Sequence, residues 1–181
     1  YLALGGAYVN AGGGTPDNAF ARATALMKLG YRVLVFIDAD KPAAPGVAEA
    51  YLQSGGSLTT WRAGMTLEDE LFLCLPDTSI DALLLKAKER VGEDLVNQQL
   101  VAKSNGLTSL ASIEALRPKS PYPLDIRVLL GEVSRTKKKS WFKSLTTYQS
   151  IVLDIVSRGY ADADASFKAV VDQLWAFTRA A

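Results

Sequence analysis

The stretch "LVFIDADKP" (residues 34–42) places four apolar residues directly before two aspartates, Asp38 and Asp40. A short apolar run is typical of a buried strand, and side chains at positions i and i+2 of a strand point to the same side. Asp38 and Asp40 can therefore reach one shared cation if the strand geometry continues just past its end. Two carboxylates held that close repel each other unless a metal or a basic group compensates their charge. The stretch predicts a buried strand that ends at a cation site.

Strand and helix signals alternate through the first half of the chain. The expected strands cover residues 2–10, 31–37 and 57–61, and the expected helices cover residues 16–29, 46–54 and 66–75. This rhythm predicts an α/β fold with a parallel, Rossmann-like sheet flanked by helices. The carboxyl ends of parallel strands share one edge, where open α/β sheets bind their ligands. We expect Asp38 and Asp40 to meet the acids of "TLEDEL" (residues 66–71) at that edge.

The second half of the chain has apolar residues at helical spacing. The expected helices cover residues 79–91 and 93–103, a segment near Ile126, residues 140–157 and a last segment from about Ala163. Arg158 and Gly159 are expected to separate the last two. Pro118, Pro121 and Pro123 predict a rigid connector before Ile126.

Composition limits the chemistry that the chain can perform. The 181 residues carry a net charge of +1, so that any nucleic-acid surface must be a local patch. The absence of histidine excludes Ser-His-Asp and Cys-His catalysis and histidine-ligated zinc. A single cysteine, Cys74, excludes an internal disulfide and a zinc–cysteine cluster. Since no apolar run approaches a membrane span and no leader resembles a signal peptide, we expect a cytoplasmic protein without a membrane partner.

The acidic cluster at the predicted sheet edge has a metal-binding and a structural explanation. Oxygen ligands alone suit Mg²⁺, Mn²⁺ or Ca²⁺, and such a cluster can hold one or two of these ions. Thr66 and Asp69, however, also fit a capping box, and Asp-x-Asp is common in turns. Taken together, a strand that ends in Asp-x-Asp and an acidic helix start at the same edge favour a metal site.

The glycine loop "AGGGTPDN" (residues 11–18) does not match a nucleotide-binding motif. It lacks the Gly-Lys-Ser/Thr ending of a P-loop, and Asp17 occupies the place of the third glycine of a dinucleotide fingerprint. An aspartate there would repel a pyrophosphate. We therefore expect a tight strand-to-helix turn with a backbone that can approach a substrate phosphate.

Basic and aromatic residues alternate in "SRTKKKSWFKSLTTY" (residues 134–148). Phosphates bind cations, and exposed bases or sugars accept aromatic faces. The alternative is a solvated charge run beside a helix whose aromatic residues belong to the core. We expect Trp141 and Phe142 in the core and the basic side chains in contact with DNA phosphates. The basic residues are Arg135, Lys137, Lys138, Lys139 and Lys143.

Four motifs in a fixed order resemble the Toprim catalytic region of the overcoming-lysogenization-defect (OLD) family of nucleases. They are "NAGGG" (residues 10–14), "LGYRVLVFIDADKP" (29–42), "LEDELF" (67–72) and "KKKSWFK" (137–143). The resemblance implies a Toprim core over residues 1–78, a helical insertion over 79–120 and a helical C-terminal part over 121–181. It further implies a metal-dependent DNA endonuclease with two Mg²⁺ or Mn²⁺ ions, for which Ca²⁺ is a non-catalytic substitute.

The resemblance also implies partners and residue roles. The partners are an N-terminal ABC-type ATPase domain, a second copy of the chain and, in some members, a helicase that acts in antiphage defence. Asp38 and Asp40 match the Asp-x-Asp metal ligands, and Glu68 matches the acid of the "LE" helix start. Lys143 matches the catalytic lysine. The second choices are Glu70 for the acid and Lys139 for the lysine.

The chain departs from the family in one place and leaves two other functions open. The family has a glutamate motif before the glycine loop, but no acid precedes Asp17, which implies an incomplete metal site in this chain. "VFIDAD" (residues 35–40) also resembles the Asp-x-Asp that holds a manganese-bound sugar nucleotide in glycosyltransferases. A non-catalytic helical interaction module would use the same acids as helix caps.

Overall fold

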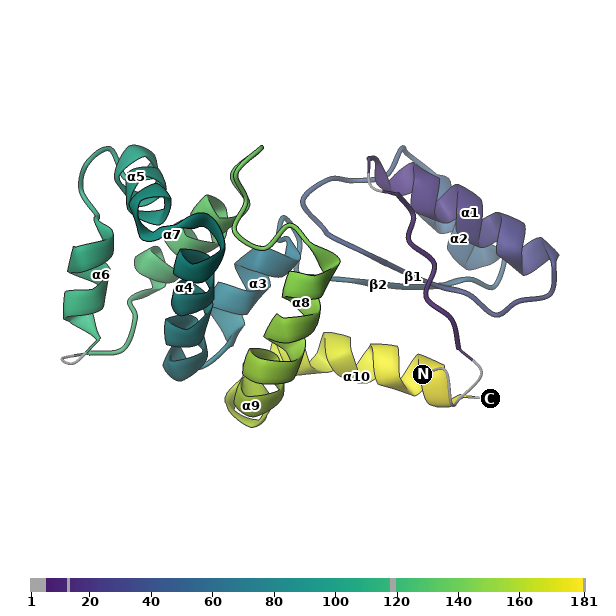
Figure 1. Cartoon of the computed structure of the whole chain (residues 1–181). Helices are drawn as coiled ribbons and strands as arrows, with labels where there is room; N and C mark the ends of the chain where they lie inside the picture. Colours follow the sequence, from purple (N-terminus) through teal and green to yellow (C-terminus); the bar gives the residue numbers. More distant parts are fainter. Residues whose placement is uncertain (1–5, 13, 118–119, 181) are drawn as a thin grey trace. The chain divides into compact units, whose positions relative to one another are not determined.

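Strand β1 (Leu34–Ile37) is the apolar run before Asp38, and it pairs in parallel with β2 (Ser57–Thr60). The computed structural model describes residues 6–12, 14–117 and 120–180 (Figure 1). Helix α2 (Val47–Gln53) joins the two strands, and Leu34 lies opposite Ser57 in the pairing. The chain is therefore a mixed α/β protein with parallel strands, as the sequence predicts, and it is mostly helical.

The sheet is smaller than predicted. In the expected first strand, residues 6–10 have no strand structure, and residues 1–5 lie outside the described residues. Tyr8 and Val9 are exposed, so that no burial of apolar surface favours strand pairing there. Within the part of the chain that the structure describes, the sheet consists of β1 and β2 alone.

Helices form most of the remaining described structure. In chain order they are α1 (Pro16–Lys28), α3 (Leu67–Cys74), α4 (Asp77–Val91), α5 (Glu93–Lys103), α6 (Leu110–Leu116), α7 (Leu124–Ser134), α8 (Leu145–Ile151), α9 (Ser157–Gly159) and α10 (Ala165–Arg179). Pro16 occupies the first position of α1, where its missing N–H is not needed, and Gly30 with φ +86° follows the end of that helix. None of the described helices combines the length and the apolar character that a membrane crossing requires.

The predicted helix over residues 140–157 begins later than expected and extends further. Helix α8 starts at Leu145, because the Ser144 hydroxyl accepts a hydrogen bond from the Thr147 N–H at 3.1 Å and caps it. A π-helical segment, η2 (Val152–Val156), then connects α8 to α9. The predicted break at residues 158–159 is therefore wrong, and a 3-10 turn, η3 (Tyr160–Asp162), ends the helix instead.

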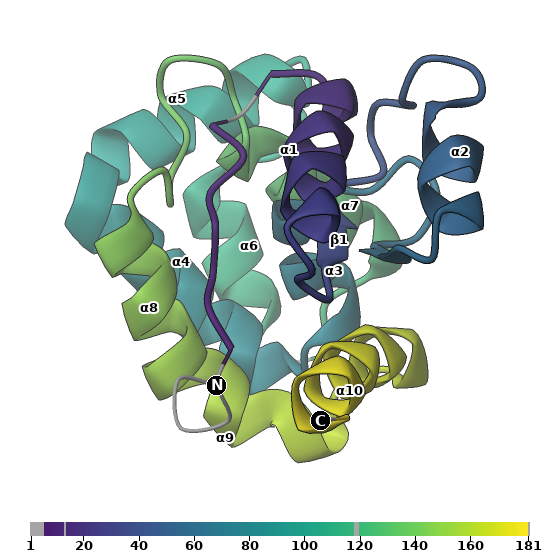
Figure 2. The same ribbon diagram turned by 90° about the vertical axis from the view of Figure 1, so that its right-hand side faces the viewer.

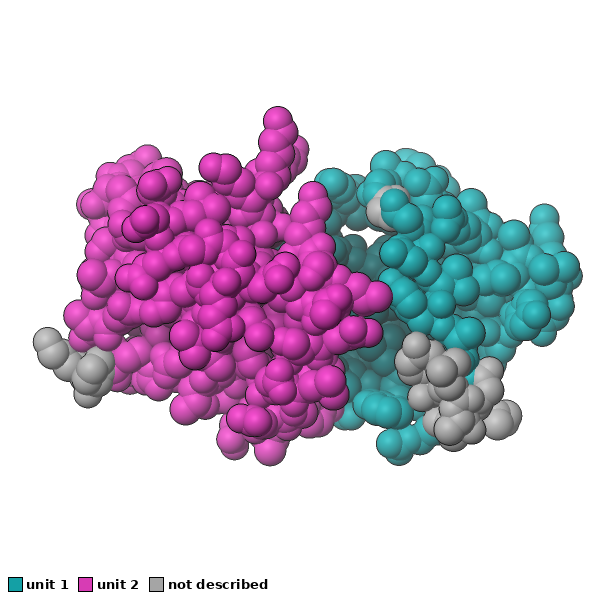
Figure 3. All heavy atoms as spheres, in the orientation of Figure 1, with its two compact units in different colours: residues 1–66, 166–181 teal, residues 67–165 magenta. Residues whose placement is uncertain are grey.

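The chain forms two compact units, coloured separately in Figure 3. Unit 1 comprises residues 1–66 and 166–181, and unit 2 comprises residues 67–165. Helix α10 therefore belongs to the same unit as the strands, although it is the last element of the chain. The units reflect packing and do not test the predicted division at residues 78 and 120, which stays a prediction.

In unit 1, helices cover both faces of the small sheet. Figures 1 and 2 show α1 and α2 on one side of the strands and α10 on the other. On the α10 side, Phe167 stacks on Trp61 with 5.4 Å between ring centroids, and Thr59 donates a hydrogen bond to Gln173. The buried core on the α1 and α2 side consists of Phe20, Ala23, Val35 and Tyr51.

In unit 2, the core forms around Phe72 of α3. The Phe72 ring lies 6.0 Å from the Trp141 ring and 6.3 Å from the Phe142 ring, measured between centroids, and all three side chains are buried. The prediction that Trp141 and Phe142 belong to the core is thus confirmed. Helix α7 packs so closely on α3 that a Cβ at Gly131 would lie 3.0 Å from the Cα of Asp69. Helix α3 is therefore fixed by packing on several sides.

Candidate functional site

Asp38 and Asp40 follow β1 directly, and both residues are exposed. The intervening Ala39 fixes the backbone at this point. Its N–H donates to the Met65 carbonyl at 2.9 Å, and its carbonyl accepts from the Gly64 N–H at 2.9 Å. The segment that follows β1 is therefore tied to the segment that follows β2, beyond the last paired residues of the two strands. These bonds hold the Asp-x-Asp backbone at the carboxyl end of the sheet.

Asp17 links the start of α1 to the loop after β1. Its carboxylate oxygen Oδ1 accepts a hydrogen bond from the Ala44 N–H at 2.9 Å. This bond to the charged form lowers the pKa of Asp17 below its usual value of 3.8. In the glycine loop before Asp17, the Gly12 N–H donates to Asn10 Oδ1 at 2.8 Å and Gly14 has φ +95°, but residues 6–10 form no strand, so that the predicted strand-to-helix turn is not borne out on its strand side. Asp17 therefore positions the loop that carries Asp40.

The two candidate glutamates of α3 lie in different surroundings. Glu70 is 1% exposed, and its Oε2 accepts a hydrogen bond from the Cys74 thiol at 3.0 Å. Glu68 is partly exposed, and its Oε1 accepts a hydrogen bond from the Tyr148 hydroxyl at 2.5 Å. Of the two side chains, Glu68 is therefore the one that an ion or ligand from solvent can reach.

The structure does not bring the predicted metal ligands together as one observed cluster. No group of three acidic or cysteine side chains that could hold a metal ion occurs among the described residues. Asp38 and Asp40 belong to unit 1, whereas Glu68 belongs to unit 2. The metal site stays a prediction. Glu68 remains the first choice of glutamate ligand, and Glu70 the second.

The basic loop (residues 135–144) joins α7 to α8 and is fixed by buried side chains. Trp141 is 1% exposed, and its backbone N–H donates to the Ser134 carbonyl at 2.8 Å. The Trp141 indole Nε1–H donates to Gln99 Oε1 at 2.8 Å, and Gln99 Nε2 donates in turn to the Lys139 carbonyl at 3.0 Å. Gln99 of α5 therefore holds both the aromatic anchor and the backbone beside it.

The cationic side chains of the basic loop remain at the surface. Arg135 and the four lysines at positions 137, 138, 139 and 143 are exposed. In the described part of the chain, no acidic side chain forms an ion pair with any of these lysines. Lys138 has φ +68°, a backbone conformation that residues other than glycine rarely adopt. The chain direction therefore changes between Lys137 and Lys139. The loop thus exposes several positive charges on a backbone that is anchored by buried Trp141 and by Gln99.

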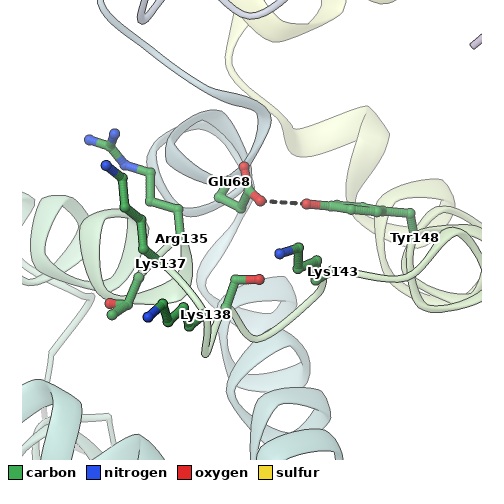
Figure 4. Close-up of a pocket in the computed structure, with 8 residues that line it drawn as sticks. Glu68, Arg135, Lys137, Lys138, Lys143 and Tyr148 are labelled. Atoms are coloured by element: carbon green, nitrogen blue, oxygen red, sulfur yellow. Dashed lines mark hydrogen bonds between the residues drawn. The ribbon is translucent and has the colours of Figure 1, made fainter. Parts of the chain in front are cut away.

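A hollow of about 320 Å³ lies beside the basic loop within unit 2. Figure 4 shows Arg135, Lys137 and Lys138 on one side of it and Lys143 on the side of Tyr148, which is bonded to Glu68. Four basic residues and one acidic residue therefore line this hollow, and three hydroxyl side chains add hydrogen-bonding capacity. The lining residues are Glu68, Arg135, Thr136, Lys137, Lys138, Ser140, Lys143 and Tyr148.

One wall of the hollow is fixed by an ion pair. Arg135 Nε lies 3.2 Å from Asp69 Oδ1, and the Asp69 side chain is only 6% exposed. Asp69 lies against Gly131 of α7, one turn before Arg135. Since the ion pair uses Nε, the terminal nitrogens of the guanidinium can still donate to an anion in the hollow.

Several contributors to this hollow were not identified from the sequence. Gln99 lies in none of the motifs, Thr136 and Ser140 were not singled out within theirs, and the ion pair between Asp69 and Arg135 joins two motifs that the sequence treats separately. Tyr148 was noted as an aromatic residue near the lysines, but its bond to Glu68 joins residues eighty positions apart.

The chain matches no protein-family model, and comparisons with curated proteins and with solved structures give no match. The functional argument therefore rests on the sequence motifs and on the geometry described above.

Proposed function

We propose that the chain is the catalytic part of a metal-dependent DNA endonuclease. The observation that carries the proposal is the basic loop: four exposed basic residues line one hollow, on a backbone anchored by buried Trp141 and Phe142. An anchored cationic surface binds phosphates without reading bases. The exposed Asp38 and Asp40 after β1 supply the kind of oxygen ligands that Mg²⁺ and Mn²⁺ prefer.

The proposed chemistry follows from the side chains that are present. In a protein without histidine, a metal is the available means of bringing the pKa of water towards neutrality. Asp38, Asp40 and Glu68 would hold the ions, and bound Mg²⁺ or Mn²⁺ would supply a water of lowered pKa and stabilise charge on the leaving oxygen. In the hydrolysis, the water oxygen would bond to phosphorus and give up its proton to solvent, the bond from phosphorus to the leaving oxygen would break, and that oxygen would take up a proton from solvent. Lys143 stabilises the negative charge of the transition state.

The resemblance extends this proposal to the protein's surroundings. An ABC-type ATPase domain preceding this region, a homodimer and a helicase partner in antiphage defence belong to the same hypothesis. They rest on the four sequence motifs alone. Their role would be to control when the DNA reaches the carboxylates.

Manganese binding tests the metal assignment. Titration calorimetry should detect Mn²⁺ binding that Asp38→Asn removes, because this carboxylate is the assigned central ligand. Glu49→Gln in α2 is the matched control, since Glu49 is an exposed acid of the same unit. Mn²⁺ binding that is unchanged by Asp38→Asn would contradict the assignment.

DNA binding tests the role of the basic loop. Charge reversal by Lys138→Glu and Lys139→Glu should lower the affinity for DNA, and the affinity of the unaltered protein should fall steeply with salt and depend little on sequence. DNA binding without manganese-dependent nicking of plasmid DNA would favour a non-catalytic nucleic-acid module. An affinity that is unchanged by the charge reversal at low salt would count against the DNA interface itself.

A further inference from the structure

Not all basic residues of the loop line the hollow. Lys137, Lys138 and Lys143 line the hollow, as Arg135 does, whereas Lys139 is exposed on the same loop and is not part of the lining. The loop therefore combines a concentrated group of cations around one hollow with a cation outside it.

The hollow is small and open to solvent. Its volume of about 320 Å³ is at the lower end of the range for small-molecule sites. The phosphates of a duplex lie along the outside of a wide cylinder and contact broad surfaces. A group that projects from the end of a strand can enter a small hollow, together with the sugar that carries it.

The charge around the hollow favours a phosphate with more than one negative charge. A terminal phosphate monoester carries about −1.5 to −2 charges at neutral pH and has three strong acceptor oxygens. A phosphodiester within a strand carries a single negative charge. Because charge-assisted hydrogen bonds to Lys and Arg grow stronger with the charge of the anion, the four cations stabilise the terminal phosphate more. The Asp69 carboxylate orders the Arg135 side chain before the ligand arrives.

Glu68 opposes an anion in this hollow. Its Oε1 accepts the hydrogen bond from the Tyr148 hydroxyl at 2.5 Å, and its charge repels a phosphate at short range. A bound cation at Glu68, as in the proposed function, would remove this repulsion. Without a metal, neutralising Glu68 should therefore strengthen the binding of a terminal phosphate.

We propose that the hollow lined by Arg135, Lys137, Lys138 and Lys143 is a receptor for the terminal phosphate of a nucleic-acid strand. This inference deepens the proposed function and rests on it for the class of ligand only. In the absence of metal the site would prefer a terminal phosphate to an internal phosphodiester, whereas the exposed charge of Lys139 contributes to backbone binding without regard to ends.

The test compares short labelled single strands of one sequence that end in a 5′-phosphate, a 3′-phosphate or hydroxyls alone. Fluorescence anisotropy is measured with EDTA, so that no cleavage occurs. A phosphorylated strand should bind about tenfold more tightly than the hydroxyl strand, as one added charge-assisted contact provides. The two phosphorylated strands distinguish which end the hollow accepts. Equal affinity of all three strands would overturn the proposal.

Matched variants of neighbouring lysines locate the effect. Lys137→Gln should reduce the preference for phosphorylated ends, because it removes a cation from the lining. Lys139→Gln removes the same charge outside the hollow, and should weaken the binding of all strands while leaving the ratio between them unchanged. A loss of end preference in Lys139→Gln that equals the loss in Lys137→Gln would show that no defined hollow is responsible.

Glu68→Gln separates this inference from the proposed function. The exchange keeps the shape of the side chain and an oxygen for the Tyr148 hydroxyl. In EDTA it should increase the preference for phosphorylated ends, whereas with Mn²⁺ it should reduce cleavage. End preference without any metal-dependent cleavage would support the terminal-phosphate site and contradict the proposed nuclease function. Cleavage without end preference would support the nuclease function and contradict the terminal-phosphate site. A Glu68→Gln protein with a weaker end preference in EDTA would contradict the charge argument.

Discussion

The loop after β1 and the basic loop after α7 carry opposite charges and are held in different ways. The segment with Asp38 and Asp40 is held by the backbone hydrogen bonds of Ala39 and by the bond of Ala44 to the Asp17 carboxylate, and the flanking Ile37 and Ala43 are only partly buried. The basic loop is fixed by Trp141 and Phe142, which are fully enclosed in the core of unit 2. Apolar anchors are worth several kcal/mol each, whereas exposed polar contacts are worth far less. Substitution of the lysines should therefore leave the fold of the basic loop intact. The stability of the segment after β1 should instead depend on pH, through the Asp17 carboxylate.

The largest expected effect is on the aromatic anchor of the basic loop. Trp141→Ala removes a buried side chain and its hydrogen bond to Gln99, and should lower the free energy of unfolding by about 3–5 kcal/mol. Trp175→Ala is the matched control, because Trp175 is 47% exposed, and it should cost less than about 1 kcal/mol. Urea denaturation of both variants checks the difference. Similar losses for the two would show that the loop is not anchored by its aromatic residue.

A smaller effect is expected where α7 packs on α3 beneath the basic loop. Gly131→Ala places a methyl group 2.9 Å from Asp69 Oδ1 and 3.0 Å from the Asp69 Cα. Because the backbone of α3 cannot move freely, the exchange should destabilise the protein by about 1–3 kcal/mol. It should also disturb the ion pair between Asp69 and Arg135. Thermal unfolding measures the first effect, and an unchanged midpoint would show that the two helices can separate without cost.

The smallest expected effect concerns Asp17 and the loop after β1. Because the pKa of Asp17 is lowered in the folded protein, its contribution to stability is present above 3.8 and is lost as the pH falls through the lowered folded value. Asp17→Asn should remove this contribution at neutral pH, so that the stabilities of the two proteins converge in acid. Unfolding midpoints measured across this pH range test the sign. A difference that grows as the pH falls would contradict the assigned hydrogen bond to Ala44.

Local sequence patterns predicted the elements that depend on local chemistry. The apolar run before Asp38 gave β1, and helical spacing with glycine or proline at the ends gave α1 to α5 closely. The strand expected over residues 2–10 is absent from residues 6–10, where no neighbouring strand buries Tyr8 and Val9. Helix α6 was missed, although the capping box formed by Ser109 and Ser112 marks its start.

The hollow depends on contacts between distant segments, which the sequence pattern does not contain. The lysines were identified because charge repeats are visible in the sequence, and the core position of Trp141 followed from its apolar size. The loop before α8 is held by the bond between the Trp141 indole and Gln99, forty-two positions away. The bond between Tyr148 and Glu68 likewise depends on how α3 and α8 pack, for which no spacing rule exists.

The most direct test of the central claim measures cleavage and DNA binding together in the Asp38→Ala protein. The assay uses supercoiled plasmid, manganese, and the protein together with the upstream sequence in which the resemblance places the glutamate motif. We predict that nicking is abolished while DNA affinity is retained, because we assign metal binding to the acids after β1 and phosphate binding to the basic loop. Full nicking activity in the Asp38→Ala protein would contradict the account, since the carboxylates after β1 would then have no part in the reaction.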